Sequence, residues 1–436
     1  MTVLNSEVPV KRILLVASKL GYQTRAFDEA AERIGVELRF ATDRCHVLDD
    51  PWGDRAIALR FEQPETAAAT IASATPKPDG ILAVGDRPAE IAALAAGRIG
   101  IPWSPPDAVA AARNKNESRR RFAAAGLRVP EFFRVPVNAG SGLAAARASY
   151  PCVLKPLGLS ASRGVIRANN QREFTAAFER IAAILEQPEI RQMQEDQDRF
   201  LQVEHYIPGV EYALEGILTR GRLRVHAIFD KPDDLRGPFF EETIYVTPSR
   251  ASEALQAAIV SATETAVEAL GLTHGPVHAE MRVHRSRDWV LEVAARPIGG
   301  ICSRSLRFTG GASLEELILR HALGEPVTDL HREPEASGVM MIPIPRNGIY
   351  RGVTGVDEAS AVAGVWSVEI TAKEGQKLQK LPEGSTYLGF LFARAEHPAE
   401  VESALRQAHA KLEFDIAPEL PILPPEPAGA RKRRTA

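Results

Sequence analysis

Cysteine is scarce in this chain, and several other scarcities exclude whole classes of protein. The 436 residues include only Cys45, Cys152 and Cys302, and so few widely separated thiols exclude a disulfide framework or a zinc cluster. The net charge of −3 gives no basic excess of the kind that nucleic-acid binding requires. No run of about 18 apolar residues occurs, and the polar start lacks a signal-peptide core. We therefore expect a cytoplasmic protein that binds neither nucleic acid nor a membrane.

Two familiar nucleotide-binding motifs are missing as well. No GKS or GKT follows a glycine-rich loop, and no GxGxxG follows a predicted strand. The hydrophobic content of 45% nevertheless supports a packed globular protein. Because 436 residues exceed what one core usually organises, we expect two or three subdomains.

Strands and helices alternate in the first hundred residues. The patterns predict strands at 12–17, 37–40 and 80–84 and helices at 25–34 and 88–97. This order predicts a doubly wound sheet. Ligands of such sheets gather beyond the carboxyl ends of the strands, so Ser18–Tyr22 and Gly85–Arg87 are candidate lining segments.

Two glutamates interrupt segments that otherwise have the pattern of buried strands. In PVHAEMRV, apolar residues alternate with polar ones, which places His278 and Glu280 on one face of a strand. Glu292 lies in the next predicted strand, WVLEVAA, after a polar turn at 284–288. A hairpin can bring the two carboxylates side by side, where they repel unless a cation lies between them. Hard oxygen ligands suit Mg²⁺.

A lysine and a loop of small residues lie upstream of these acids. The apolar strand PCVLKP carries Lys155 near its end, and a loop rich in Gly and Ser follows as far as Gly164. A lysine in this place can hold phosphate oxygens as a point charge. Small residues let backbone amides approach a phosphate and let the loop open and close.

The rest of the chain gives further elements. Helices are predicted at 115–125, 173–185, 254–270 and 398–412, with a hairpin around Arg220-Gly221. The basic run Arg119–Arg121 is interpreted as a solvated helix face. HREPEASG at 331–338 is predicted to be a linker, and the Pro-rich, basic end a disordered tail whose Arg431–Arg434 are solvated.

In combination, these segments resemble the ATP-grasp superfamily. The resemblance extends over about residues 110 to 320, and its motifs are Asn114-Lys115, VLKP, the loop to Gly164, VEHYIPGVEY, Glu280 and EVAAR. Within the superfamily the chain is most similar to carboxylate-amine ligases of the L-amino acid ligase type, whose plan is similar to biotin carboxylase. The segments GVMMIPIPRNG and YLGFLFARAEHPAEVESALRQAH resemble the C-terminal domain of that type.

The resemblance implies an α/β (α+β) ATP-grasp fold. An N-terminal Rossmann-like domain is expected at 1–112 and the ATP-grasp domain at 113–328, with a lid at about 130–202. A C-terminal α+β domain is expected at 329–418 and the disordered tail at 419–436. A homodimer is expected on the same ground.

The resemblance also implies roles in binding ATP and Mg²⁺ or Mn²⁺. The phosphate contacts would come from Lys115 and Lys155, the adenine contacts from Glu204, Tyr206 and Ile207, the ribose contacts from Glu211, and the loop contacts from Ser160, Ser162 and Gly164. Glu280 and Glu292 would hold the metal. Many members have Asn where this chain has Ala294, so water would replace a third protein ligand. The catalytic set implied is Lys155, Glu280, Glu292 and Arg296.

Substrate contacts are expected on the same side of the ATP-grasp domain. The candidates are Lys231, Glu242, His278, Arg296, Gly299, Gly300 and Arg304. Some keep a plainer alternative. His278 is equally well explained as a satisfied core histidine and Arg304 as an exposed arginine. Arg296 could be a structural ion-pair partner, but the resemblance favours its phosphate role. Cys302 is interpreted as small packing, because nothing near it suggests a base partner.

The activity implied is ATP-dependent ligation of a small carboxylic acid, such as an amino acid, to an amine through an acyl phosphate. Small-molecule acids and amines are then the partners. One alternative is a biotin-carboxylase-like or formate-dependent enzyme, which a tiny closed acyl pocket would favour. Another is an inactive nucleotide-binding regulator, which the presence of both metal acids disfavours.

Overall fold

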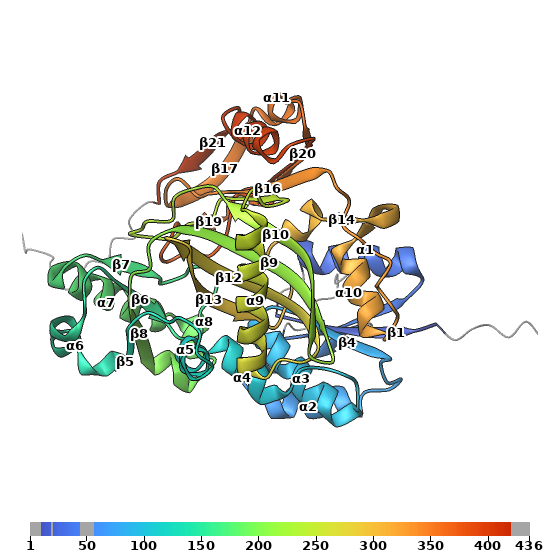
Figure 1. Ribbon diagram of the computed structural model, residues 1–436, viewed down its shortest axis with the longest axis horizontal. Helices are drawn as coiled ribbons and strands as arrows, with labels where there is room; N and C mark the ends of the chain where they lie inside the picture. Colours follow the sequence, from blue (N-terminus) through green and yellow to red (C-terminus); the bar gives the residue numbers. More distant parts are fainter. Residues whose placement is uncertain (1–9, 19–20, 44–55, 420–436) are drawn as a thin grey trace, which may run out of the picture.

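The computed structural model of the chain describes residues 10–18, 21–43 and 56–419. Figure 1 shows the N-terminal part (blue) beside a central sheet (yellow), with the lid (green) at one end and the C-terminal part (orange to red) above. Cys45, part of the Ser18–Tyr22 segment and the tail from residue 420 lie outside the described residues.

The N-terminal part is a parallel four-stranded sheet in the order β3-β2-β1-β4. Its elements are β1 (Arg12–Ala17), α1 (Tyr22–Ile34), β2 (Glu37–Thr42), β3 (Ala56–Ala58), α2 (Pro64–Ser73), β4 (Gly80–Val84) and α3 (Asp86–Ile99). The strand β1 is almost wholly buried, as a central parallel strand should be. The doubly wound order predicted from the sequence is confirmed here, and the ends of β1 and β4 point one set of loops toward the central sheet.

Two short helices lead into the lid. They are α4 (Pro106–Arg113) and α5 (Lys115–Ala124), and the Asn114 side chain caps α5 by accepting from the amides of Asn116 and Glu117. The lid is an antiparallel sheet in the order β5-β8-β6-β7 with helices on one side. Its elements are β5 (Phe132–Pro136), η2 (Val137–Ala139), α6 (Gly142–Arg147), β6 (Cys152–Pro156), β7 (Ile166–Ala168), α7 (Gln171–Leu185), α8 (Pro188–Arg191), η3 (Asp196–Arg199) and β8 (Phe200–His205).

An antiparallel sheet of eight strands forms the centre, in the order β13-β12-β9-β10-β11-β16-β20-β18. Its first members are β9 (Val210–Thr219), β10 (Arg222–Lys231), β11 (Ile244–Thr247), β12 (Gly275–His284) and β13 (Arg287–Ala294), and α9 (Glu253–Leu270) packs on it. The predicted turn at Arg220-Gly221 is confirmed, and both residues have the positive φ of a tight hairpin. Among the described helices, none has both the length and the apolar character needed to cross a lipid bilayer.

The C-terminal part continues this sheet instead of standing apart from it. It comprises β16 (Ala336–Ile342), β17 (Gly348–Thr354), α11 (Val356–Ser360), β18 (Val365–Ile370), β19 (Lys377–Leu378), β20 (Gly389–Ala395), α12 (Pro398–His409) and β21 (Glu413–Ala417). Between β13 and β16 the chain forms η4 (Cys302–Ser305), β14 (Arg307–Phe308), η5 (Thr309–Gly311), β15 (Ala312–Ser313) and α10 (Leu314–Ala322), and α10 packs on α1 and β4 of the N-terminal part. Since β16 pairs with β11 and already starts at the buried Ala336, the linker predicted at 331–338 is shorter than expected.

The hairpin of β12 and β13 sets the two glutamates opposite each other. Glu280 pairs with Glu292 in the register of the two strands. A β-bulge follows directly, because Met281 pairs with Val290 and leaves Leu291 as the extra residue. Bulges re-aim neighbouring side chains and occur often beside functional sites. The predicted neighbourhood of the two acids is therefore confirmed.

The interpretation of Arg119–Arg121 as a solvated face is wrong for Arg119. This side chain is 2% exposed, and its guanidinium donates to Glu204 Oε1 at 2.8 Å and to the Val290 carbonyl at 2.9 Å. It thereby joins α5 to a lid strand and a central strand. The sequence does not distinguish Arg119 from its neighbours in the run, and one of them, Arg120, is indeed 69% exposed.

Replacing Arg119 by Ala is expected to destabilise the fold by about 3 to 5 kcal/mol, because one member of a buried ion pair is lost. The matched change Arg120→Ala should cost within about 0.5 kcal/mol, as exposed substitutions usually do. Urea unfolding followed by circular dichroism measures both free energies. Equal values for the two variants would contradict the buried-pair account.

Candidate active site

A cavity of about 1140 Å³ lies between the central sheet, the lid, the N-terminal sheet and the C-terminal part. Small-molecule sites usually measure roughly 300–1,000 Å³, so this cavity has room for more than one reactant. Loops beyond β1 and β4 contribute to it, as predicted, through Ser18, Tyr22 and Asp86 among others.

The floor of the cavity is a row of charged side chains on adjacent strands. On β12, His278, Glu280 and Arg282 alternate with buried apolar residues and face the cavity. Arg282 lies opposite Glu211 of β9, which in turn lies opposite Lys231 of β10. Because opposite residues of a sheet share a face, the strands bring these groups together in one plane.

A buried lysine sits at the centre of three of these acids. Lys231 Nζ lies 2.7 Å from carboxylate oxygens of each of Glu211, Glu242 and Glu280. Burial alone lowers the pKa of Lys231, but the three carboxylates outweigh it and hold the pKa well above the usual value. For Glu242, burial and then the neighbouring Glu280 raise the pKa. The cluster is therefore a charge-compensated unit and not a bare group of anions.

His278 bridges two acids on the same floor. Its Nδ1 lies 3.0 Å from Glu215 Oε2, and its Nε2 lies 3.6 Å from Glu280 Oε1. Burial lowers the pKa of the imidazole, but hydrogen bonds to Glu215 and Glu280 raise it to about 9. The histidine thus has satisfied partners, as a core histidine should, and it also lines the cavity, where its substrate role stays a prediction.

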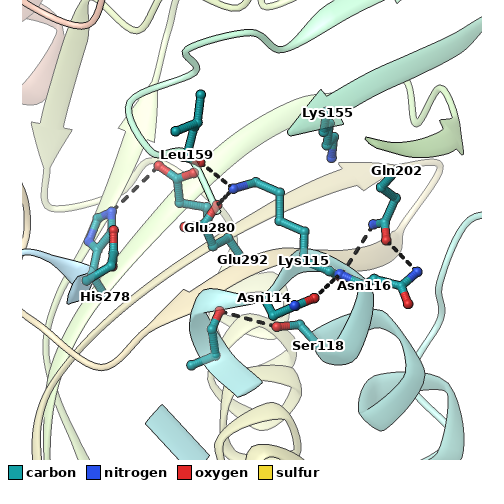
Figure 2. A network of polar contacts seen from close by, with 12 residues as sticks. Asn114, Lys115, Asn116, Ser118, Lys155, Leu159, Gln202, His278, Glu280 and Glu292 are labelled. Atoms are coloured by element: carbon teal, nitrogen blue, oxygen red, sulfur yellow. Dashed lines mark hydrogen bonds and ion pairs between the residues drawn. The ribbon is translucent and has the colours of Figure 1, made fainter. Parts of the chain in front are cut away.

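Two lysines lie on the lid side of the cavity, across from Glu280 and Glu292. Figure 2 shows Lys115 reaching between Leu159, whose carbonyl accepts from Nζ at 2.6 Å, and Glu292, whose Oε2 lies 3.7 Å away. Lys155 Nζ instead donates to Glu204 Oε2 at 2.5 Å. The two ammonium groups therefore flank the cavity between the lid and the floor.

Glu204 is the anchor for both Lys155 and Arg119. The carboxylate is 3% exposed and contacts the two cations together. Burial raises its pKa, but Arg119 and Lys155 lower the pKa to about 2. Glu204 thus stays ionised, and it fixes the direction in which Lys155 enters the cavity.

Arg296 connects the central sheet to the N-terminal part. Its Nε donates to Asp86 Oδ1 at 2.8 Å, and Nη1 donates to the Pro297 carbonyl at 3.1 Å. Burial lowers the pKa of the guanidinium, but Asp86 and Glu292 raise it well above the usual range. The remaining nitrogen makes no hydrogen bond within the described residues, and the side chain lines the cavity.

Most site residues predicted from the sequence line this one cavity. They are Lys115, Lys155, Ser160, Ser162, Glu204, Tyr206, Ile207, Glu211, Glu242, His278, Glu280, Glu292, Arg296, Gly299 and Gly300. Three others do not. Lys231 lies beneath its acids, Gly164 packs against Pro156, and Arg304 pairs with Glu369 and stacks over Trp366.

Several residues at or beneath the cavity escaped the sequence analysis. Among them, Tyr245 and Tyr387 line the cavity, whereas the wholly buried Glu215 lies behind His278. Glu215 carried the same signal as Glu280, an acid inside an apolar strand, and it now holds His278 and the amide of Ile298. Tyr245 donates to Glu242 at 2.8 Å. Tyr387 comes from the C-terminal part, and no local pattern distinguishes it, since only the tertiary fold brings it to the cavity.

Two stretches of the chain, one in the lid and central sheet and one in the C-terminal part, match known protein families. Residues 148–305 match the ATP-grasp domain, and residues 340–417 match the L-amino acid ligase C-terminal domain 2. The chain contains both domains. The ATP-grasp match spans the lid strands β6 to β8, the floor of the cavity and Arg296, whereas the ligase C-terminal match contains Tyr387.

Relatives and solved structures agree with these domains. The chain is 28% identical over 241 residues to the alanine–anticapsin ligase of Bacillus subtilis, covering 52% of this chain and 50% of that protein. It is 23% identical over 318 residues to an uncharacterised protein of Sinorhizobium fredii, covering 73% and 64%. The crystal structure of an L-amino acid ligase from Bacillus licheniformis superposes with a TM-score of 0.80 at 26% identity, covering 93% of this chain and 98% of that one.

More distant structures share the fold alone. An ADP complex of N5-carboxyaminoimidazole ribonucleotide synthetase superposes with a TM-score of 0.67 at 14% identity, covering 92% of this chain and 97% of that one. The chain spans about half to two thirds of the length of the curated relatives that it matches first. The two domains therefore have the fold of an L-amino acid ligase of the ATP-grasp class.

Proposed function

We propose that the chain is an ATP-dependent ligase that joins the carboxylate of an amino acid, or of a related small acid, to an amine. The observation that carries the proposal is the register of β12 and β13, which sets Glu280 opposite Glu292 on the floor of a cavity ringed by Lys115, Lys155 and Arg296. The names of the relatives, alanine–anticapsin ligase and L-amino acid ligase, support the same class of reaction.

ATP is proposed to lie between the lid and the floor. Lys115 and Lys155 contact its phosphates, and Ser160 and Ser162 approach them from the lid loop. The buried Tyr206 and Ile207, with Glu204, border the adenine site, and Glu211 faces the ribose. Gly164 serves this loop from outside the cavity, because its backbone conformation and close packing on Pro156 leave no room for a side chain.

The proposed divalent ion fits the side chains that are present. Glu280 and Glu292 offer hard carboxylate oxygens, as Mg²⁺ prefers. The cation nearest Glu292, Lys115 at 3.7 Å, is beyond hydrogen-bonding distance, so the carboxylate is not held by it. A bound Mg²⁺ would neutralise charge on the phosphate oxygens. We propose Mg²⁺ or Mn²⁺, since carboxylate oxygens suit both ions and Ala294 supplies no further ligand.

The reaction proposed needs charge neutralisation more than covalent help from the protein. A carboxylate oxygen attacks the γ-phosphorus of ATP and forms an acyl phosphate, with ADP leaving. The amine then attacks the acyl carbon, an amide forms, and phosphate leaves with the bonding electrons. Arg296 lies beside the acids and can stabilise the transferring group with its unpaired edge, since positioned cations act most strongly in a site that excludes water.

The substrate end is proposed to lie toward Gly299, Gly300 and the C-terminal part. Backbone approach to the acyl group is possible there because neither glycine carries a side chain. Glu242, held by Tyr245 and Lys231, is proposed to contact the ammonium group, and His278 to border the reacting centre. Arg304 is not proposed to bind substrate, since its guanidinium pairs with Glu369 and lies over the ring of Trp366.

The decisive assay measures phosphate release from ATP with Mg²⁺ across a matrix of amino acids and amines, with mass spectrometry of the products. Release that requires two substrates and yields an amide is expected. A phosphorylated product without condensation would identify a kinase instead, and ATP binding without turnover in any mixture would identify a regulator.

The homodimer remains a prediction from the resemblance, and the cytoplasmic location remains a prediction from the composition. Sedimentation equilibrium of the purified chain tests the first, and fractionation of the producing cells tests the second.

A further inference from the structure

One short segment of the C-terminal part contacts both the lid and the reaction cavity. Residues 382–387 connect β19 to β20, and their last three members, Ser385, Thr386 and Tyr387, line the cavity. The turn at Gly384 is tight, because an added Cβ would lie 1.7 Å from the Gln379 carbonyl oxygen. The segment therefore turns sharply between its two lid contacts and its cavity residues.

The first two residues of this segment hold the lid. The amide of Gly164 donates to the Pro382 carbonyl at 2.9 Å, and Arg163 Nε donates to the Glu383 carbonyl at 2.9 Å. Both donors belong to the loop whose Ser160 and Ser162 face the cavity. The loop is therefore tied to the C-terminal part by its backbone.

The Glu383 side chain adds a paired contact to the next lid helix. Both of its oxygens accept from Arg180 of α7, the Nη2 bond measuring 2.8 Å. Arg180 also lies over the ring of Phe239, 5.0 Å from its centroid, which fixes the guanidinium plane. A two-point arginine–carboxylate contact is directional as well as attractive. It therefore sets the lid at one angle to the C-terminal part.

We propose that Glu383 is a positioning residue that couples ATP consumption to amide formation. This proposed role of Glu383 rests on the ligase activity proposed above. By holding α7 and the Ser160–Gly164 loop against the segment that carries Tyr387, Glu383 keeps the phosphate end and the acyl end of the cavity closed together. The acyl phosphate formed inside then meets the amine. When the contact is lost, water reaches the acyl phosphate, attacks it, and returns the free carboxylate and phosphate.

The variant Glu383→Ala separates this role from catalysis. Its ADP and its amide are measured in the same reaction by chromatography and mass spectrometry, and the release of a fluorescent ATP analogue is followed by stopped flow. In the unchanged protein we expect equal amounts of ADP and amide. In Glu383→Ala we expect about five times more ADP than amide, and release of the ATP analogue about five times faster. A factor of about five corresponds to the loss of one well-formed surface ion pair. The exchanged pair Glu383→Arg with Arg180→Glu should restore both values.

Glu402→Ala is the matched control, because Glu402 is 21% exposed against 24% for Glu383 and also pairs with arginines of the surface. The Glu402→Ala variant should leave both the ratio of ADP to amide and the rate of nucleotide release unchanged. Equal ADP and amide with unaltered release in Glu383→Ala, even with a lower melting temperature, would overturn the proposal. If the unchanged protein forms no amide with any substrate pair, the ligase proposal fails, and the rate of nucleotide release alone decides whether Glu383 holds the lid.

Discussion

Replacing Glu292 by Gln is expected to lower kcat by about a thousandfold, because the loss of one metal-binding carboxylate removes several kcal/mol of transition-state stabilisation. The fold should remain nearly intact. The Glu292 side chain is 29% exposed, and its one ion-pair contact within the described residues, with Lys115, is long at 3.7 Å. Steady-state rates at saturating ATP and Mg²⁺, together with the melting temperature, measure the two effects.

The control for this change is Glu37→Gln. Glu37 also lies on a strand, is 28% exposed and pairs with Arg12 and Arg39, but it is far from the cavity lining. Its variant should keep full activity. A titration with Mg²⁺ adds a second test, since Glu292→Gln should need more of the ion for half its residual rate. Normal activity in Glu292→Gln would contradict the metal assignment.

The pairing of Glu280 with Glu292 was predictable because its signal is local. An acid within an apolar strand must be compensated, and two such strands joined by a short turn must be neighbours. The turn is in fact only Arg285-Ser286, shorter than the predicted 284–288, yet the pairing of Glu280 with Glu292 is the same. The Ser/Gly loop after Lys155 was found for a similar reason, since its composition alone indicates close backbone approach.

Residues whose role depends on distant partners were harder to predict. Arg119 looks like its neighbours in a basic run, and only the arrival of Glu204, 85 positions away, makes it a buried group. The same holds for Lys231, whose three acids come from β9, from β12 and from the segment before β11. Local propensity carries no information about such encounters, because they are set by the tertiary fold.

The boundary of the C-terminal part was also hard to predict from local sequence. A change of composition near residue 330 indicated a separate C-terminal domain, and the match at 340–417 supports a distinct family region there. The strands β16, β20 and β18 nevertheless extend the central sheet, so the C-terminal part is hydrogen-bonded to the floor of the cavity. This continuity gives a physical route by which Tyr387 and its neighbours reach the substrate end.

Replacing Arg296 by Lys should lower kcat by about 100- to 1,000-fold, the usual cost of removing one positioned donor from a developing charge. A lysine keeps the positive charge, but it lacks the planar fork of the guanidinium, whose separate edges can face Asp86 and the transferring phosphoryl group at the same time. The KM for ATP should change less than kcat, since the stabilisation is needed mainly in the transition state.

Arg121→Lys is a closely matched control for that change. Arg121 makes the same pair of bonds, from Nε to the Glu117 carboxylate and from Nη1 to the Leu270 carbonyl, but it lies outside the cavity lining. Its variant should retain the activity of the unchanged protein. If Arg296→Lys instead keeps full kcat and only lowers the melting temperature, Arg296 is a structural partner of Asp86, and the stabilisation of the phosphoryl group must come from Lys115 and Lys155.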